Sequence, residues 1–234
     1  MPSYENLYQA YEHLPWIAWV PAYLMGAWML FKAPFFKGMM GFMIAAIFLD
    51  GMCAGMWFHL GGAEHTMFGP MALLFILLGD ARYFVLMYRY GRYPHLPEEK
   101  FGPWPMWLKC VIWTLIPTLT LGLGKLVLPE AFAIARNTYI VYEIVMWISA
   151  FLFLTQLLPS WLDSSDPKEA GYLRWLRIIT ITELAHYGLW IISDALILTG
   201  VDAGFGLRFI PDVIYYACFI PVVYFFAPAR LKAR

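Results

Sequence analysis

The sequence is poor in charged residues and has no excess of either sign. Charged side chains make up 14% of the 234 residues, the formal net charge is zero, and 62% of the residues are hydrophobic. A soluble domain has roughly 25% charged and 45–50% apolar residues, so this chain cannot bury its apolar side chains in one core and cover its surface with polar ones. The composition excludes a disordered chain, and the lack of a basic block excludes a nucleic-acid-binding protein.

Cysteine is also scarce. The three cysteines, Cys53, Cys110 and Cys218, lie in separate apolar runs and form no close pair. We expect small packing residues, not a disulfide framework or a CxxC metal or redox site. The first thirteen residues contain no lysine or arginine, so we expect no secretory signal. The N-terminus is expected to be a short interfacial segment with Tyr4 and Tyr8 near the lipid headgroups.

Long apolar runs dominate what is present. A membrane-spanning helix needs about 20 mostly apolar residues. The chain has seven such runs, at 14–31, 38–60, 67–90, 106–128, 137–158, 172–199 and 205–227. The connections between them are short, so the sequence predicts an all-α fold. Residues 1–234 are expected to form a single domain, a bundle of seven transmembrane helices.

The basic residues predict how this bundle is oriented. With the N-terminus outside, the outer side holds Lys125, Arg136 and Arg208, and Arg82 lies within a run. The other twelve basic residues fall on the inner side: Lys32, Lys37, Arg89, Arg92, Lys100, Lys109, Lys168, Arg174, Arg177, Arg230, Lys232 and Arg234. Loops on the cytoplasmic side carry an excess of Lys and Arg. We therefore expect an outside N-terminus, a cytoplasmic C-terminus and a location in the bacterial inner membrane.

Carboxylates inside the apolar runs are the most informative feature of the chain. Six acidic residues fall there: Asp50, Asp80, Glu143, Glu183, Asp194 and Asp212. An ionisable group at the bilayer centre costs about 2.5–3.5 kcal/mol on insertion scales. Such groups are expected to face the interior of the bundle, where they are candidates for function.

The sixth run carries the densest polar stripe. It contains Glu183, His186, Tyr187, Trp190 and Asp194, whose spacing places them near one face of a helix. A column of this kind can line a cavity or relay protons. Alternatively, its side chains form hydrogen bonds that hold neighbouring helices together.

Glu183 and His186 also have the Glu-x-x-His spacing of di-iron helix bundles. Those sites need two such motifs and two further glutamates, whereas the runs contain one, so we assign no metal ligand. No lysine lies in the seventh run, which excludes a retinal Schiff base there, and deep paired histidines for haem are missing. The sequence identifies no cofactor.

Two pairs of charged residues need partners. Asp80 and Arg82 are two residues apart and so do not face each other on a helix, which means that Asp80 needs another partner. Arg208 and Asp212 lie one turn apart and either pair within the helix or leave Arg208 free to guard an outer vestibule or to bind an anionic headgroup.

Two short segments resemble known membrane enzymes. LLGDARYFVL and IISDALIL, which contain Asp80 and Asp194, resemble the GD and SD segments of lysoplasmalogenase-type membrane hydrolases, although the helix after the first lacks that family's histidine. The chain is also similar to integral membrane terpene cyclases in size and in the acids of the second and seventh runs, Asp50 and Asp212, but it lacks their Trp-Glu signature. These resemblances imply a lipid or isoprenoid substrate.

The leading hypothesis is therefore an integral membrane enzyme that acts on a lipid or isoprenoid through general acid–base catalysis by buried carboxylates. The predicted catalytic residues are Asp80, Glu183, His186, Asp194 and Asp212. The predicted substrate-binding residues are Asp50, Glu143, Tyr187, Trp190 and Arg208. The alternatives are a proton-coupled transporter or channel, and a non-catalytic subunit of a larger membrane complex. The expected partners are membrane lipids, a lipid-like small molecule, and either further copies of the chain or other membrane proteins.

Overall fold

The computed structural model describes residues 3–12, 16–32, 37–53, 79–97, 100 and 102–232. This part of the chain is α-helical with short connections and contains no strand. Residues 79–86 form a helix that continues into η1. The other elements are α1 (Tyr4–Glu12), α2 (Trp16–Lys32), α3 (Lys37–Cys53), η1 (Met87–Arg92), α5 (Trp104–Val127), α6 (Pro129–Phe132), α7 (Ala135–Leu152), η2 (Phe153–Leu157), α8 (Leu158–Trp161), α9 (Pro167–Leu198), α10 (Ala203–Val213), η3 (Ile214–Cys218), α11 (Phe219–Phe226) and α12 (Ala229–Lys232).

Four continuous helical segments in the described part are long and apolar enough to cross a membrane: Trp104–Val127, Arg136–Trp161, Pro167–Leu198 and Ala203–Phe226. The shortest have 24 residues, which at about 1.5 Å per residue is about 36 Å, more than the hydrocarbon thickness of a bilayer. These segments coincide with the last four predicted runs. The all-α class and the presence of membrane-length apolar helices are thus confirmed.

The first three predicted runs are described only in part. α2 and α3 have 17 residues each. α2 coincides with the first run and α3 with the start of the second, while residues 79–92 cover the end of the third. The remainder of the second and third runs lies outside the described residues. The count of seven spans and the orientation in the membrane stay predictions.

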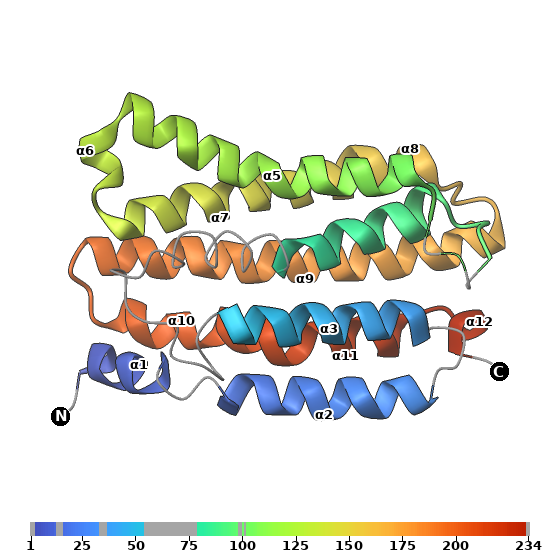
Figure 1. Ribbon diagram of the computed structural model, residues 1–234, viewed down its shortest axis with the longest axis horizontal. Helices are drawn as coiled ribbons and strands as arrows, with labels where there is room; N and C mark the ends of the chain where they lie inside the picture. The colour runs from blue at the N-terminus through green and yellow to red at the C-terminus, as the bar shows by residue number, and fades with distance from the viewer. Residues whose placement is uncertain are drawn as a thin grey trace.

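The long helices lie side by side along the long axis of the molecule, and α9 runs through the middle of the bundle (Figure 1). α9 packs against α7 on one side and against α10 and α11 on the other, and α2 packs against α3. α1, α6 and the turn between α9 and α10 lie at one end, called here the α6 end. The connection before α5, the connection before α9 and α12 lie at the opposite end, called the α12 end.

Three π-helical segments, η1, η2 and η3, interrupt the α-helices, and each is followed by a proline. Pro94 comes two residues after η1, Pro159 two residues after η2 and Pro221 three residues after η3. Proline lacks the amide proton that would bond the carbonyl four residues earlier, so the preceding turn is free to widen. π-helical turns often accompany functional sites, and η3 contains Tyr215, which belongs to one of the polar clusters described below.

Apolar side chains cover much of the outside of the bundle, and several charged side chains of the described part are buried inside it. Leu126 on α5 is 81% exposed and Ile181 on α9 is 55% exposed. The buried charged and histidine side chains are Asp80, Arg82, Arg89, Glu143, Glu183, His186, Asp194 and Asp212. This distribution is the reverse of that in a soluble domain and fits a chain surrounded by lipid.

Arg89 shows that one predicted inner-side cation is not a solvated surface charge. Its side chain is buried, and its guanidinium donates four hydrogen bonds of 3.0–3.2 Å to the carbonyl oxygens of Tyr93, Leu96, Pro97 and Lys100. All four carbonyls belong to the connection that follows η1, where the chain has left the helix. Arg89 therefore fixes the start of the connection to α5.

Candidate functional site

Helix α9 positions most of the polar side chains in the interior of the bundle. Glu183, His186, Tyr187 and Asp194 on this helix are all buried, as their spacing predicts. Asp166 begins the helix by accepting a hydrogen bond of 2.8 Å from the amide of Lys168, which satisfies one of the free amides of the first turn. Glu183 lies about halfway along α9, whereas Asp194 lies near its end. Two separate polar clusters form around these two acids.

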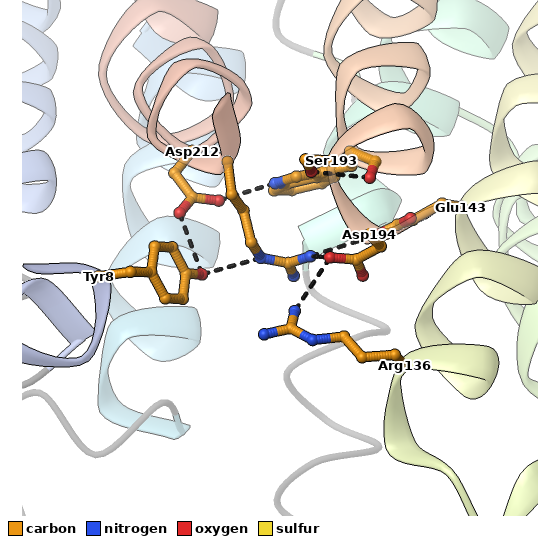
Figure 2. A network of polar contacts seen from close by, with 8 residues as sticks. Tyr8, Arg136, Glu143, Ser193, Asp194 and Asp212 are labelled. Atoms are coloured by element: carbon orange, nitrogen blue, oxygen red, sulfur yellow. Dashed lines mark hydrogen bonds and ion pairs between the residues drawn. The ribbon is translucent and has the colours of Figure 1, made fainter. Parts of the chain in front are cut away.

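The arginine cluster lies toward the α6 end and is centred on Asp194 (Figure 2). It comprises Tyr8, Arg136, Glu143, Trp190, Asp194, Arg208 and Asp212. Asp194 is fully buried. Its Oδ1 accepts a hydrogen bond of 3.0 Å from Nη1 of Arg136 and a second from Nη1 of Arg208. Two cations from different helices thus converge on one carboxylate oxygen.

Arg208 connects the rest of this cluster. Its Nη1 lies 3.8 Å from Oε1 of Glu143 on α7, and its Nε donates a hydrogen bond of 2.9 Å to the hydroxyl of Tyr8. The Tyr8 hydroxyl in turn donates to Oδ2 of Asp212 at 3.4 Å, while Trp190 Nε1 donates to Oδ1 of Asp212 at 2.7 Å. Arg208 therefore binds acids on two other helices and is not free to hold a headgroup.

The cluster also holds α1 against the bundle. The Asp202 carboxylate accepts hydrogen bonds of 2.9 Å and 3.0 Å from the amides of Tyr4 and Glu5, the first residues of α1. The ring of Tyr8 packs on Phe205 and Phe209 of α10, with centroids 6.1 Å and 5.4 Å away. Tyr8 is buried against α10, and its depth near the headgroups stays a prediction. Its hydroxyl faces inward because Arg208 and Asp212 are its partners.

The tyrosine cluster lies nearer the middle of α9 and comprises Asp80, Tyr142, Glu183, His186, Tyr187 and Tyr215. Asp80 accepts a hydrogen bond of 2.6 Å from the hydroxyl of Tyr187 and another from the hydroxyl of Tyr142. The expectation that Asp80 has a partner other than Arg82 is thus confirmed. The Arg82 guanidinium lies over the Tyr215 ring at 4.7 Å, and its Nε donates to the carbonyl of Gly79 at 3.0 Å.

Glu183 and His186 form a buried pair one helical turn apart. The Nδ1 atom of His186 lies 3.4 Å from Oε2 of Glu183 and 3.3 Å from the carbonyl oxygen of Thr182. Both neighbours are acceptors, so the hydrogen-bond network assigns the ring proton to Nδ1. Nε2 of His186 is buried and has no hydrogen-bond partner among the described residues. In this tautomer Nε2 carries a free lone pair, which is the form of imidazole that accepts a proton.

Aromatic rings surround His186 and connect the two clusters. Its ring centroid lies 4.1 Å from that of Tyr187, 5.0 Å from that of Trp190 and 5.3 Å from that of Tyr215. Tyr187 bonds Asp80 in the tyrosine cluster, and Trp190 bonds Asp212 in the arginine cluster. The clusters are therefore neighbours on α9, with an aromatic layer between them.

The structure divides the predicted site residues into these two groups. Asp194, Asp212, Glu143, Trp190 and Arg208 come together in the arginine cluster. Asp80, Glu183, His186 and Tyr187 come together in the tyrosine cluster. The side chain of Asp50 lies outside the described part of the structure.

Sequence reasoning missed four participants, which are Tyr8, Arg136, Tyr142 and Tyr215. Tyr142 immediately precedes Glu143, Arg136 was counted only as an outer charge, and Tyr8 was placed in an interfacial segment near the headgroups. The sequence held a signal for Arg136. If Glu143, Asp194 and Asp212 share one buried site, their negative charge needs a second cation besides Arg208. The tyrosines gave no such signal, because the chain contains 15 of them.

Neither cluster contains an evident metal site. Among the described residues, no group of three or more His, Cys, Asp or Glu side chains is arranged to hold a metal ion. Comparisons with known protein families, curated proteins and solved structures found no match. The case for a function therefore rests on the side chains of this chain alone.

Proposed function

We propose that the chain is an integral membrane enzyme that acts on a lipid or isoprenoid substrate by general acid–base catalysis. The tyrosine cluster is its catalytic centre. The arginine cluster holds the helices that carry this centre. The observation that supports the proposal is the buried Glu183–His186 pair, in which one ring nitrogen is anchored and the other is free.

A general base must be held in one orientation and must keep a lone pair for the substrate. Glu183 and the Thr182 carbonyl orient the imidazole through Nδ1, so Glu183 is a positioning residue. Nε2 of His186 takes the proton from the reacting hydroxyl or water. Asp80, with its two phenol donors Tyr142 and Tyr187, supplies further acid–base groups in the same cluster. The aromatic rings around His186 suit an apolar or cationic reaction intermediate.

This proposal retains the predicted number of spans, the predicted orientation and the predicted location of the protein. The last four predicted runs, together with α2, α3 and the helix that ends in η1, are consistent with seven spans. The N-terminus then lies outside and the basic α12 end lies in the cytoplasm of a bacterial cell. In this proposal, a role in holding α1, α7, α9 and α10 together replaces the predicted catalytic role of Asp194 and Asp212. It also replaces the substrate-binding role predicted for Glu143, Trp190 and Arg208.

The test is conversion of a bacterial total lipid and isoprenoid extract by the purified full chain, followed by mass spectrometry. His186→Gln is expected to lower turnover about 10²- to 10⁴-fold, the usual contribution of a general base. Glu183→Gln is expected to lower turnover less, because His186 keeps its second anchor at Thr182. His95→Gln is the matched control, because His95 is an exposed histidine at the α12 end. Full turnover in His186→Gln, or no conversion by the wild-type protein, would contradict the proposal.

A proton-coupled transporter is the second candidate, and one observation favours it. The polar residues of α9 form a column from Glu183 through His186 and Trp190 to Asp194, about 16 Å along the helix at 1.5 Å per residue. Proteoliposomes with an internal pH dye distinguish the two functions. Dissipation of a proton gradient by a protein that converts no lipid would favour transport.

A further inference from the structure

Two arginines on the outer face of α9 have no role in either polar cluster. Arg174 and Arg177 lie one helical turn apart near the α12 end, and both are exposed. They line an open hollow of about 330 Å³ together with Ser164, Ala170, Leu173 and Ile178. The hollow thus combines two guanidinium groups and a hydroxyl with an apolar wall.

Neither guanidinium has a partner among the described residues, whereas other arginines at this end of the bundle are engaged. Arg89 binds four carbonyl oxygens. Arg230 lies over the ring of Tyr172 at 3.9 Å and donates to the carbonyl of Lys168 at 3.3 Å. Two adjacent unpaired guanidiniums repel each other and are matched by an anion, since each presents a planar set of donors suited to a phosphate or carboxylate.

The acids nearest in sequence already have partners of their own. Glu169 accepts a hydrogen bond from the amide of Asp163 at 2.7 Å and lies 3.1 Å from Nε2 of His95. Asp163 accepts bonds from the amide and hydroxyl of Ser165, which hold the pKa of this carboxyl below its usual value. Asp166 caps α9. These bonds tie the carboxylates to the connection before α9, and the guanidiniums on the helix face stay available.

The same face of α9 continues as an apolar stripe. Ile181 and Ala185 follow Arg177 at steps of four residues, and Ile192 follows seven residues later. All three are exposed. Residues at such spacing share one side of a helix. The pair of cations lies near the end of a membrane-length helix and suits an anionic lipid headgroup. The exposed isoleucines that follow suit the acyl chain of the same lipid.

We infer that the hollow at Arg174 and Arg177 binds the phosphate headgroup of an anionic phospholipid, whose acyl chain lies along Ile178 and Ile181. This site is independent of the proposed enzyme activity, because none of its residues belongs to the two clusters. The occupant is a lipid rather than a free phosphate, because the wall of the hollow is apolar and leads onto the apolar stripe.

The test uses the full chain in nanodiscs that contain phosphatidylglycerol and phosphatidylcholine, with bound lipid counted by native mass spectrometry after mild extraction. The double variant R174Q/R177Q is expected to bind phosphatidylglycerol about thirtyfold more weakly, the contribution of two basic groups near an anionic surface. The control K109Q/R230Q removes the same charge from the same end of the bundle and is expected to keep the preference. I181S is expected to weaken binding by a smaller factor of about three to ten, because it shortens the apolar contact.

Three outcomes would overturn the inference. The first is an unchanged preference for phosphatidylglycerol in R174Q/R177Q. The second is an equal loss in K109Q/R230Q, which would mean that only the net charge of this end matters. The third is displacement of the lipid by millimolar inorganic phosphate, which would identify a free anion as the occupant. Because all of these side chains are exposed, a thermal melt is expected to show that the variants fold like the wild type.

Discussion

The two polar clusters on α9 differ in the side chains that contact their buried acids. In the arginine cluster, Arg136 and Arg208 face Asp194, Glu143 and Asp212. In the tyrosine cluster, Asp80 is bonded by phenols and Glu183 faces the His186 imidazole, with Arg82 as a nearby cation. Ion pairs between fixed cations and acids hold helices in place, whereas phenols and imidazole exchange protons. Burial of acids in a membrane bundle therefore does not by itself identify a catalytic site; the partners of each acid distinguish structure from chemistry.

The largest expected effect on stability comes from the centre of the arginine cluster. Asp194→Asn removes the charge that Arg136 and Arg208 share, and leaves two cations close together in the bundle. Breaking a buried pair of this kind costs about 3–5 kcal/mol. Denaturant unfolding in mixed micelles measures the loss, with Asp163→Asn as the control because Asp163 is exposed. If the Asp194→Asn protein were as stable as the control, the arginine cluster would have no structural role.

A smaller effect is expected at Asp80, because the nearby guanidinium of Arg82 keeps the contacts that it makes with other groups. The amide of Asp80→Asn accepts a hydrogen bond from one phenol and donates to the oxygen of the other, so the two phenols Tyr142 and Tyr187 stay partnered. The expected loss is about 1–2 kcal/mol, close to that of one or two ordinary hydrogen bonds. The same unfolding assay checks it. A loss equal to that of Asp194→Asn would show that the two clusters do not differ in the way described.

The smallest effect is expected at the edge of the arginine cluster. Tyr8→Phe deletes the hydroxyl that links Arg208 to Asp212 and retains the ring contacts with α10. We expect a loss of about 1 kcal/mol and faster amide hydrogen exchange in α1, with little change in α9. Tyr4→Phe is the matched control, because Tyr4 is half exposed and its hydrogen bond to Asp202 uses the backbone amide. Equal rates of amide hydrogen exchange in α1 of the two variants would show that the Tyr8 hydroxyl does not hold α1 against the bundle.

Much of this architecture could be predicted from the sequence, and the reasons are physical. Apolar runs longer than a bilayer is thick predicted the last four spanning segments, and the helical period predicted that Glu183, His186 and Asp194 are buried on one face. The partners of each acid could not be predicted, because they come from other helices. Arg208 shows this well. It lies one turn before Asp212, yet it binds Asp194 and Glu143 across helix boundaries.

The resemblance to membrane hydrolases grouped Asp80 with Asp194, and the structure gives these two acids different partners. Asp80 is bonded by Tyr142 and Tyr187, and Asp194 by Arg136 and Arg208. Short sequence segments carry the acid itself but not its surroundings. The chemistry of a carboxylate depends on those surroundings, so the segments alone could not assign the two acids to different roles.

The most direct test of this account is the protonation of the His186 ring. Histidine labelled with ¹⁵N in the full chain, with the His186→Gln protein used to assign the signal, reports by NMR which ring nitrogen carries the proton. The account predicts a neutral ring with the proton on Nδ1, toward Glu183 and the Thr182 carbonyl, and a free lone pair on Nε2. A neutral ring with its proton on Nε2 would contradict the account, because Nε2, the proposed base, would then have no lone pair for the substrate proton.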